Sequence, residues 1–225
     1  MSEDLQAVEV ETGHAPGASI IWLHGLGADG HDFAPVVPQL NLRGPVRFIF
    51  PHAPVRRVTI NGGMPMRAWY DIVSLDRAGP EDESGIRESA ASVSSLIDME
   101  RNRGVPCARI LLAGFSQGGA IALHLALRYP EALGGVLALS SYLPLPQTLA
   151  AEGSAANAAI PAFLAHGSED DTVPETLGQY SRSILEQRGC LVDWHSYPMG
   201  HTVCPEELSD LSLWLHGRLE GSVGA

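Results

Sequence analysis

Short apolar runs alternate along the chain with amphipathic stretches of helical period. Near-continuous apolar runs of this kind are typical of parallel strands that are covered on both faces. The segment Val8-Glu9-Val10-Glu11 alternates instead, which predicts a half-exposed antiparallel edge strand, and the mixed composition of residues 191–197 favours a strand near an edge. The other predicted strands are residues 20–23, 46–50, 109–113, 135–139 and 161–165.

Apolar residues spaced three and four apart predict helices between these strands. Ser84 is the expected N-cap of the first helix. Pro205 begins the last helix and places Glu206 and Glu207 in its first turn, where negative charge complements the helix dipole. The predicted helices cover residues 86–97, 120–127, 177–184 and 205–218.

The alternation of strands and helices predicts an α/β fold. Right-handed crossovers give a mostly parallel, doubly wound sheet with helices on both faces, and such sheets place their sites at the carboxyl ends of the strands. The 225 residues suit one domain, spanning residues 1–225. Residues 52–83 have no strong period, so we expect a loop excursion over the site, with a plain surface loop as the alternative.

Charge excludes several classes of partner. The 26 acidic residues outnumber the 14 basic ones, all arginine, and the formal net charge is −12. This balance, without a basic cluster, argues against nucleic acid as a partner because phosphate binding needs neutralising cations. It also disfavours charge-driven binding to an anionic membrane.

The cysteines and the N-terminal residues bear on the cellular compartment. Cys107, Cys190 and Cys204 are widely spaced and match no metal-binding pattern, which predicts reduced thiols in a cytosolic protein and no metal site. The first four residues, Met-Ser-Glu-Asp, lack the basic and apolar regions of a signal peptide. No apolar run approaches the roughly 18 residues of a membrane span. We expect a cytoplasmic protein without an integral membrane segment.

The strongest chemical signal is Gly114-Phe115-Ser116-Gln117-Gly118, which matches the pattern G-x-S-x-G. An apolar run precedes it and a predicted helix follows it. In this context Ser116 occupies a sharp strand-to-helix turn, the nucleophile elbow, where small neighbours permit close backbone packing. The N-terminus of the helix favours negative charge developing beside Ser116. We therefore predict a catalytic Ser116, and the alternative is a glycine-rich structural turn.

A serine nucleophile needs a base, and the base needs an orienting carboxylate, in the chain order Ser, acid, His. The loop after residues 161–165 carries three consecutive acids, Glu169, Asp170 and Asp171, and spacing alone does not choose among them. Of the nine histidines, only His201 satisfies the order and lies between the last strand and the last helix. His201 is therefore the predicted general base.

Acyl transfer also needs hydrogen-bond donors for the oxyanion. The backbone N–H of Gln117, directly after the nucleophile, is one expected donor. The glycine-rich loop after residues 20–23 supplies the other, and Leu26 is the best candidate because its neighbouring glycines permit the required bend. The loop matches neither of the glycine-rich phosphate-binding patterns.

Six motifs stand in order along the chain. They are His24–Gly30, Pro51–Pro54, Trp69–Ile72, Gly114–Gly119, His166–Pro174 and Met199–His201. Together they closely resemble the phospholipase/carboxylesterase family, which contains bacterial carboxylesterases and eukaryotic acyl-protein thioesterases. The resemblance covers roughly residues 8–218 and implies an α/β-hydrolase fold.

The resemblance assigns roles to particular residues. The family's acid falls at the fifth position of the loop H-G-x-x-D-x-x-V-P, which is Asp170 here, with Asp171 as the runner-up. Ser116 and His201 are assigned likewise as nucleophile and base. The oxyanion amides are again those of Leu26 and Gln117.

Residues 58–70 resemble the bacterial esterase branch and are expected to line the acyl groove. Ile60, Met64, Met66 and Trp69 would then contact an apolar acyl chain. The alternative is that these side chains pack the loop onto the domain.

The resemblance implies a serine carboxylesterase that hydrolyses small-molecule carboxylic esters of apolar acyl groups through an acyl-enzyme on Ser116, without a cofactor. Acyl-protein thioesterase or lysophospholipase activity of the same triad, acting on an acyl thioester or a lysophospholipid, is the alternative. A non-catalytic scaffold with the hydrolase fold is a distant one. Relatives that resemble this chain are often dimers, so a homodimer is expected by analogy.

Overall fold

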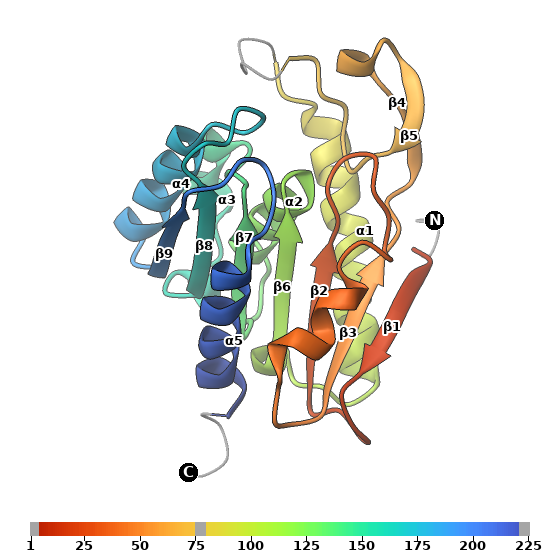
Figure 1. Cartoon of the computed structure of the whole chain (residues 1–225), viewed down its shortest axis with the longest axis vertical. Helices are drawn as coiled ribbons and strands as arrows, with labels where there is room; N and C mark the ends of the chain where they lie inside the picture. The colour runs from red at the N-terminus through yellow and green to blue at the C-terminus, as the bar shows by residue number, and fades with distance from the viewer. Residues whose placement is uncertain (1–4, 75–79, 221–225) are drawn as a thin grey trace.

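The computed structural model describes residues 5–74 and 80–220, and a seven-stranded sheet forms its centre (Figure 1). The strand order is β1-β3-β2-β6-β7-β8-β9; β1 is antiparallel to β3, and all other neighbours are parallel. The strands are β1 (Ala7–Glu11), β2 (Ala18–Leu23), β3 (Val46–Pro51), β6 (Ile110–Phe115), β7 (Gly135–Leu139), β8 (Pro161–Gly167) and β9 (Leu191–Tyr197). The predicted α/β fold with a mostly parallel sheet is confirmed.

Helices cover both faces of the sheet (Figure 1). Apolar side chains of α1, α2 and α4 pack with one face, and those of η1 and α5 pack with the other. The α-helices are α1 (Glu83–Asn102), α2 (Gln117–Ala126), α3 (Leu149–Glu152), α4 (Glu175–Gln187) and α5 (Pro205–Glu220). The 3₁₀ segments of the sheet domain are η1 (Ala34–Leu40), η3 (Cys107–Arg109), η4 (Pro146–Thr148) and η5 (Ala155–Asn157). In the parts of the chain that the structure describes, no helix has the length and apolar character needed to span a bilayer.

Both predicted edge strands lie at the edges of the sheet. Strand β1 forms one edge and β9 the other. The alternating pattern of β1 follows from this position, because one of its faces meets solvent while the other packs on the core. In β9, Leu191 at the start of the strand is 64% exposed.

The predicted cap of α1 is wrong. The N-cap is Asp82, whose Oδ1 accepts a hydrogen bond from the backbone N–H of Gly85 at 3.0 Å, rather than Ser84. Both residue types cap helices well. The choice is made by a tertiary contact, because Asp82 Oδ2 also accepts from the backbone N–H of Asp71 at 2.9 Å.

Residues 52–83, expected to form a loop excursion, contain two short strands that the sequence analysis did not predict. Strands β4 (Val55–Val58) and β5 (Met64–Arg67) form a separate antiparallel hairpin, joined through η2 (Thr59–Asn61) and two glycines. Gly62 and Gly63 have φ values of 67° and 73°, a left-handed conformation that glycine adopts without strain. This Gly-Gly pair between two short extended segments was the available sequence signal. Residues 75–79 of the predicted loop lie outside the described residues.

Candidate active site

Ser116 lies in the turn between β6 and α2, at the carboxyl ends of the parallel strands. Its backbone has φ 53° and ψ −121°, a strained conformation for a residue other than glycine. Two hydrogen bonds hold it there. The Ser116 N–H donates to Leu139 O at 2.9 Å, and the Ser141 hydroxyl donates to Ser116 O at 2.7 Å.

The glycines of the G-x-S-x-G pattern are required by close backbone contacts. A Cβ on Gly114 would lie 2.3 Å from the carbonyl carbon of Gly118. A Cβ on Gly118 would lie 2.3 Å from Leu23 O, on the neighbouring strand. Neither position can accept a side chain without displacing backbone, so the sharp turn depends on both glycines.

The loops after β8 and β9 are tied together by backbone contacts. The N–H of Ser168 donates to Tyr197 O at 2.8 Å, and that of Glu169 donates to Met199 O at 3.0 Å. Gly167 makes this approach possible, since a Cβ there would lie 2.2 Å from Met199 O. The contacts bring the acidic loop against the loop that carries His201.

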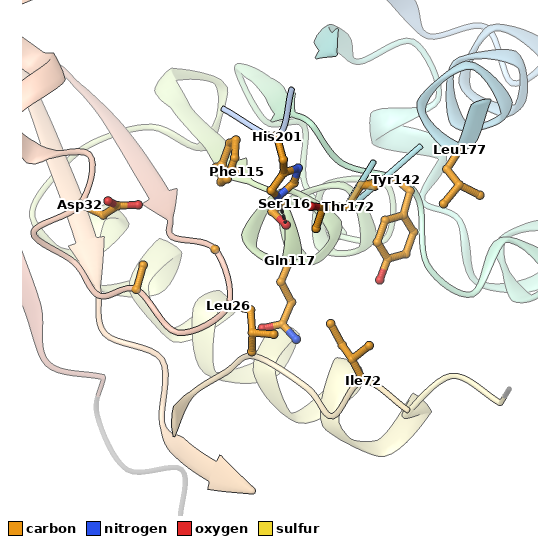
Figure 2. A pocket seen from close by; sticks show the side chains of 13 residues that line it. Leu26, Asp32, Ile72, Phe115, Ser116, Gln117, Tyr142, Thr172, Leu177 and His201 are labelled. Atoms are coloured by element: carbon orange, nitrogen blue, oxygen red, sulfur yellow. Dashed lines mark hydrogen bonds between the residues drawn. The ribbon is translucent and has the colours of Figure 1, made fainter. Parts of the chain in front are cut away.

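Ser116, His201 and Asp170 form a continuous hydrogen-bond relay. His201 Nδ1 lies 2.7 Å from Asp170 Oδ2. On the other side of the ring, His201 Nε2 lies 2.9 Å from Ser116 Oγ, as Figure 2 shows. A carboxylate only accepts hydrogen bonds, so Nδ1 carries the proton and Nε2 is free to accept from the serine hydroxyl. This is the tautomer that a general base for Ser116 requires.

The structure distinguishes the three consecutive acids. The side chain of Asp170 is completely buried, and its Oδ1 accepts from the backbone N–H groups of Thr172 at 2.9 Å and Val173 at 2.8 Å. Glu169 and Asp171 are exposed. Only Asp170 therefore has an orientation fixed by donors on both oxygens, and only Asp170 reaches His201.

A second histidine lies close to Asp170 without competing for the role of base. His166 Nε2 is 2.7 Å from Val173 O, to which it donates, and 3.6 Å from Asp170 Oδ2. Burial lowers the pKa of His166, so the imidazole is neutral at pH 7 and stabilises the loop as a hydrogen-bond donor.

The expected oxyanion donors both line the cavity beside Ser116. Gln117 is the first residue of α2, so its N–H has no acceptor within the helix. In the other loop, the N–H of Gly27 donates to Arg67 O at 2.9 Å and that of Ala28 to Gly25 O at 3.3 Å. These bonds hold the loop around Leu26, and the role of its amide as an oxyanion donor stays a prediction.

Trp69, expected either to contact substrate or to pack, lies in the interior with no exposed surface. Its backbone N–H donates to Gln117 Oε1 at 2.8 Å, and its indole N–H donates to His24 O at 2.9 Å. The Gln117 side chain also donates through Nε2 to Tyr70 O at 2.7 Å. One short segment, residues 69–70, thus contacts both loops that carry the oxyanion amides.

His24 completes these contacts. Its Nε2 accepts from the backbone N–H of Ala53 at 3.0 Å, so Nδ1 carries the proton and donates to Gly25 O at 2.7 Å. Burial lowers the pKa of His24, which keeps the ring in the neutral form that this pair of bonds needs. Sequence reasoning considered only the backbone of Gln117 and the chain position of His24, so it missed the structural roles of both side chains.

The cavity beside Ser116 has a volume of about 250 Å³ (Figure 2). Its lining includes residues that sequence reasoning did not select: Asp32, Ile72, Phe115, Tyr142, Thr172, Val173 and Leu177. Most of this surface is apolar, as expected for a site that binds an acyl chain.

Ile60, Met64 and Met66 are not among the residues that line this cavity. They belong to η2 and β5 of the hairpin, where Met64 is 60% exposed and the Met66 sulfur accepts a hydrogen bond from the Asn61 amide at 3.1 Å. Their contact with substrate, like that of Trp69, stays a prediction. Across residues 5–74 and 80–220, no three His, Cys, Asp or Glu side chains are grouped to hold a metal ion.

This combination of fold and site defines a serine hydrolase with the α/β-hydrolase fold. The chain belongs to the phospholipase/carboxylesterase family, whose model matches residues 5–217. The family resemblance of the sequence motifs is thereby confirmed.

Individual relatives agree with this assignment. The chain is 41% identical to acyl-protein thioesterase 1 of Neurospora crassa, over 90% of this chain and 87% of the relative. It is 37% identical to the protein of that name from Mycosarcoma maydis, over 92% and 94%. Among solved structures, acyl-protein thioesterase 2 of Zea mays has a TM-score of 0.83 at 33% identity, covering 95% of this chain and 99% of that one. SOBER1 of Arabidopsis thaliana has a TM-score of 0.85 at 32% identity, covering 90% and 99%.

Proposed function

We propose that this enzyme hydrolyses carboxylic esters and thioesters of apolar acyl groups through an acyl-enzyme on Ser116. The observation that carries the proposal is the relay from Ser116 Oγ through His201 to Asp170, next to a largely apolar cavity. The homodimer and the cytoplasmic location expected from the sequence stay predictions.

In the first half of the reaction, His201 Nε2 takes the hydroxyl proton as Ser116 Oγ attacks the acyl carbonyl. Asp170 holds the imidazole in the required tautomer and stabilises the imidazolium that forms. The amides of Leu26 and Gln117 donate to the tetrahedral oxyanion, and each donor is worth about 2.7–4 kcal/mol if it behaves like measured cases.

In the second half, the imidazolium gives its proton to the departing alcohol or thiol, which leaves Ser116 acylated. A water molecule deprotonated by His201 then attacks the acyl-enzyme. The carboxylic acid is released, and the proton returns to Ser116 Oγ. This sequence needs no group beyond those of the chain and water.

The test is a series of p-nitrophenyl esters from acetate to palmitate, assayed with wild type and Ser116→Ala. We expect Ser116→Ala to lose hydrolysis of every ester by a factor of about 10⁶, as in enzymes that use the same relay. Its unfolding transition should match that of wild type, because Ser116 Oγ makes no structural contact that the fold needs. Hydrolysis retained by folded Ser116→Ala would overturn the proposal.

Thioester hydrolysis is the second candidate for the physiological reaction, and the names of the relatives from Neurospora crassa and Mycosarcoma maydis favour it. The discriminating measurement compares kcat/KM for an ester and a thioester with the same acyl group. A higher value for the thioester, after correction for the uncatalysed rates, identifies a thioesterase. A higher value for the ester identifies a carboxylesterase.

A further inference from the structure

The cavity beside Ser116 has two chemically different sides (Figure 2). Ile72, Tyr142 and Leu177 lie on one side of the serine, and Asp32 lies on the opposite side, beyond Phe115. The first side is apolar apart from the hydroxyls of Tyr142 and Thr172. The second ends in a carboxylate.

The backbone around Asp32 is held in place by its neighbours. The N–H of Asp32 donates to Asp29 O at 3.1 Å, and the carboxylate of Asp29 accepts from the N–H of His31 at 2.7 Å. The next residue, Phe33, is buried, and its ring lies 5.1 Å from that of Trp22. Asp32 is therefore an exposed side chain on a fixed turn, with its carboxylate at the cavity.

The charge of Asp32 is not neutralised by a neighbouring cation. Among the described residues, the structure gives Asp32 no ion pair. Burial lowers the pKa of two nearby histidines, His24 and His52, and the Arg67 guanidinium donates to Ala53 O at 2.8 Å. His31, the chain neighbour of Asp32, packs against the ring of His52 at a centroid distance of 5.6 Å. A carboxylate in this state is available to a charged group of the substrate.

The proposed reaction fixes how a substrate lies between the two sides. With the carbonyl oxygen at the amides of Leu26 and Gln117, the acyl chain and the leaving group extend in different directions from Ser116. An apolar acyl chain is favoured on the side of Ile72 and Leu177, because burial there removes apolar surface from water. The leaving group is then directed past Phe115 toward Asp32.

We propose that Asp32 is a specificity-determining residue that selects substrates whose leaving alcohol or thiol carries a positive charge next to the scissile bond. This inference rests on the proposed function and specifies its substrate class. The attraction is that of one solvent-exposed ion pair, so it is modest and is weakened by salt.

The test uses two substrates that differ only in charge, butyrylthiocholine and its uncharged tert-butyl isostere. The quantity measured is the ratio of their kcat/KM values, charged over neutral, in wild type and in Asp32→Asn. The intrinsic reactivity of each substrate cancels when the ratios of the two enzymes are compared. We expect Asp32→Asn to lower the ratio by about threefold to fivefold at low salt, with a smaller change at high salt.

Asp29→Asn is the matched control. It removes the same charge from the same loop, but Asp29 does not line the cavity, and asparagine can still accept the hydrogen bond from His31. We expect its ratio to stay within about twofold of the wild-type value, since the charge at that position is screened from the substrate.

Two results would overturn the role of Asp32. One is an equal ratio in wild type and Asp32→Asn at low salt. The other is an equal fall in both aspartate variants, which would show a general effect of the acidic surface. Ser116→Ala is assayed in parallel with both substrates. If hydrolysis of both survives in that variant, the proposed function fails and this inference fails with it, whereas loss in Ser116→Ala with unchanged ratios rejects Asp32 alone.

Discussion

Two buried carboxyl groups in this enzyme have opposite surroundings. In the loop after β8, the Asp170 side chain has no exposed surface, yet its oxygens accept hydrogen bonds from Thr172 N, Val173 N and His201 Nδ1. In the first turn of α5, Glu207 is equally buried, and neither of its carboxyl oxygens has a hydrogen-bond partner among the described residues.

The surroundings decide what each group can do. Burial, opposed by the smaller effect of the Cys204 backbone N–H, raises the pKa of Glu207 to about 8, so this carboxyl is mostly protonated at pH 7. The expected placement of Glu206 and Glu207 in the first turn of the last helix is confirmed. At Glu207, however, the loss of hydration outweighs the favourable effect of the helix dipole on the carboxylate. At Asp170, three donors replace the lost water and fix the carboxylate toward His201. Burial alone therefore does not keep a carboxyl group ionised. Hydrogen-bond donors around its oxygens are also needed.

Among the carboxyl groups compared, the largest effect is expected when the hydrogen bond between Asp170 and His201 is altered. Asp170→Asn keeps the shape of the side chain but no longer favours the tautomer in which His201 Nε2 accepts from Ser116. We expect kcat to fall by about 10⁴-fold, as in serine proteases that carry the equivalent change, which corresponds to about 5.5 kcal/mol. The measurement is the initial rate with p-nitrophenyl butyrate, with unfolding monitored by circular dichroism.

Asp171→Asn is the control for that variant. Asp171 is exposed, so its activity should stay within about twofold of wild type, the range of ordinary surface substitutions. An equal loss in both variants would contradict the assignment of Asp170.

The second prediction concerns a buried carboxylate that has hydrogen-bond and ion-pair partners but lies away from the cavity. Glu100 of α1 is buried and contacts the Ser19 hydroxyl, Arg47 Nη1 at 2.8 Å and Arg103 Nη1 at 2.9 Å. Glu100→Ala leaves two arginines without this partner, and we expect the free energy of unfolding to fall by about 3–5 kcal/mol. Urea unfolding measures this loss.

Glu9→Ala is the matched control, because Glu9 pairs with the same Arg103 at 3.0 Å but is 36% exposed. The free energy of unfolding of Glu9→Ala should fall by less than about 1 kcal/mol. The rate per folded molecule should be unchanged in both variants. Equal losses of unfolding free energy in Glu100→Ala and Glu9→Ala would show that burial does not increase the contribution of the Glu100 ion pairs to stability.

The smallest effect is expected at Glu207, and it depends on pH. The folded-state pKa of Glu207, about 8, lies above the ordinary value of 4.5 for a glutamate side chain, so protonation of the carboxyl favours the folded state. Its contribution is fully present below pH 4.5 and is lost as the pH rises toward and through 8. Glu207→Gln cannot titrate, so its stability relative to wild type should improve by up to about 4 kcal/mol between pH 5 and pH 8.5.

Urea unfolding at both pH values measures this difference, with Glu206→Gln as the exposed control on the same turn. The free energy of unfolding of Glu206→Gln should change with pH as that of wild type does. If Glu207→Gln also loses stability in parallel with wild type, Glu207 does not titrate in this window.

Local sequence determined much of the fold. Runs of apolar residues mark the buried strands because both faces of a parallel sheet are covered, and alternation marks β1 because only one of its faces is. The pattern around Ser116 is equally local, since the glycines that permit the turn are its near neighbours in the chain. Chain order and placement between elements were enough to select His201 from nine histidines.

Other features depend on residues far apart in the chain, and spacing does not encode them. Spacing alone does not distinguish Asp170 from Glu169 and Asp171, although the family resemblance favours Asp170. The packing of the loops after β8 and β9 brings Asp170 to its partner, His201, which is 31 residues away in the chain. Trp69 was expected either to contact the substrate or to pack the loop onto the domain, and its bonds to His24 and Gln117 hold it inside the protein. The sequence by itself thus determined the strands, the elbow and the order of the catalytic groups, all set by near neighbours. The tertiary structure alone decided which side chains line the cavity and which buried carboxyl meets donors, because both depend on contacts between distant segments.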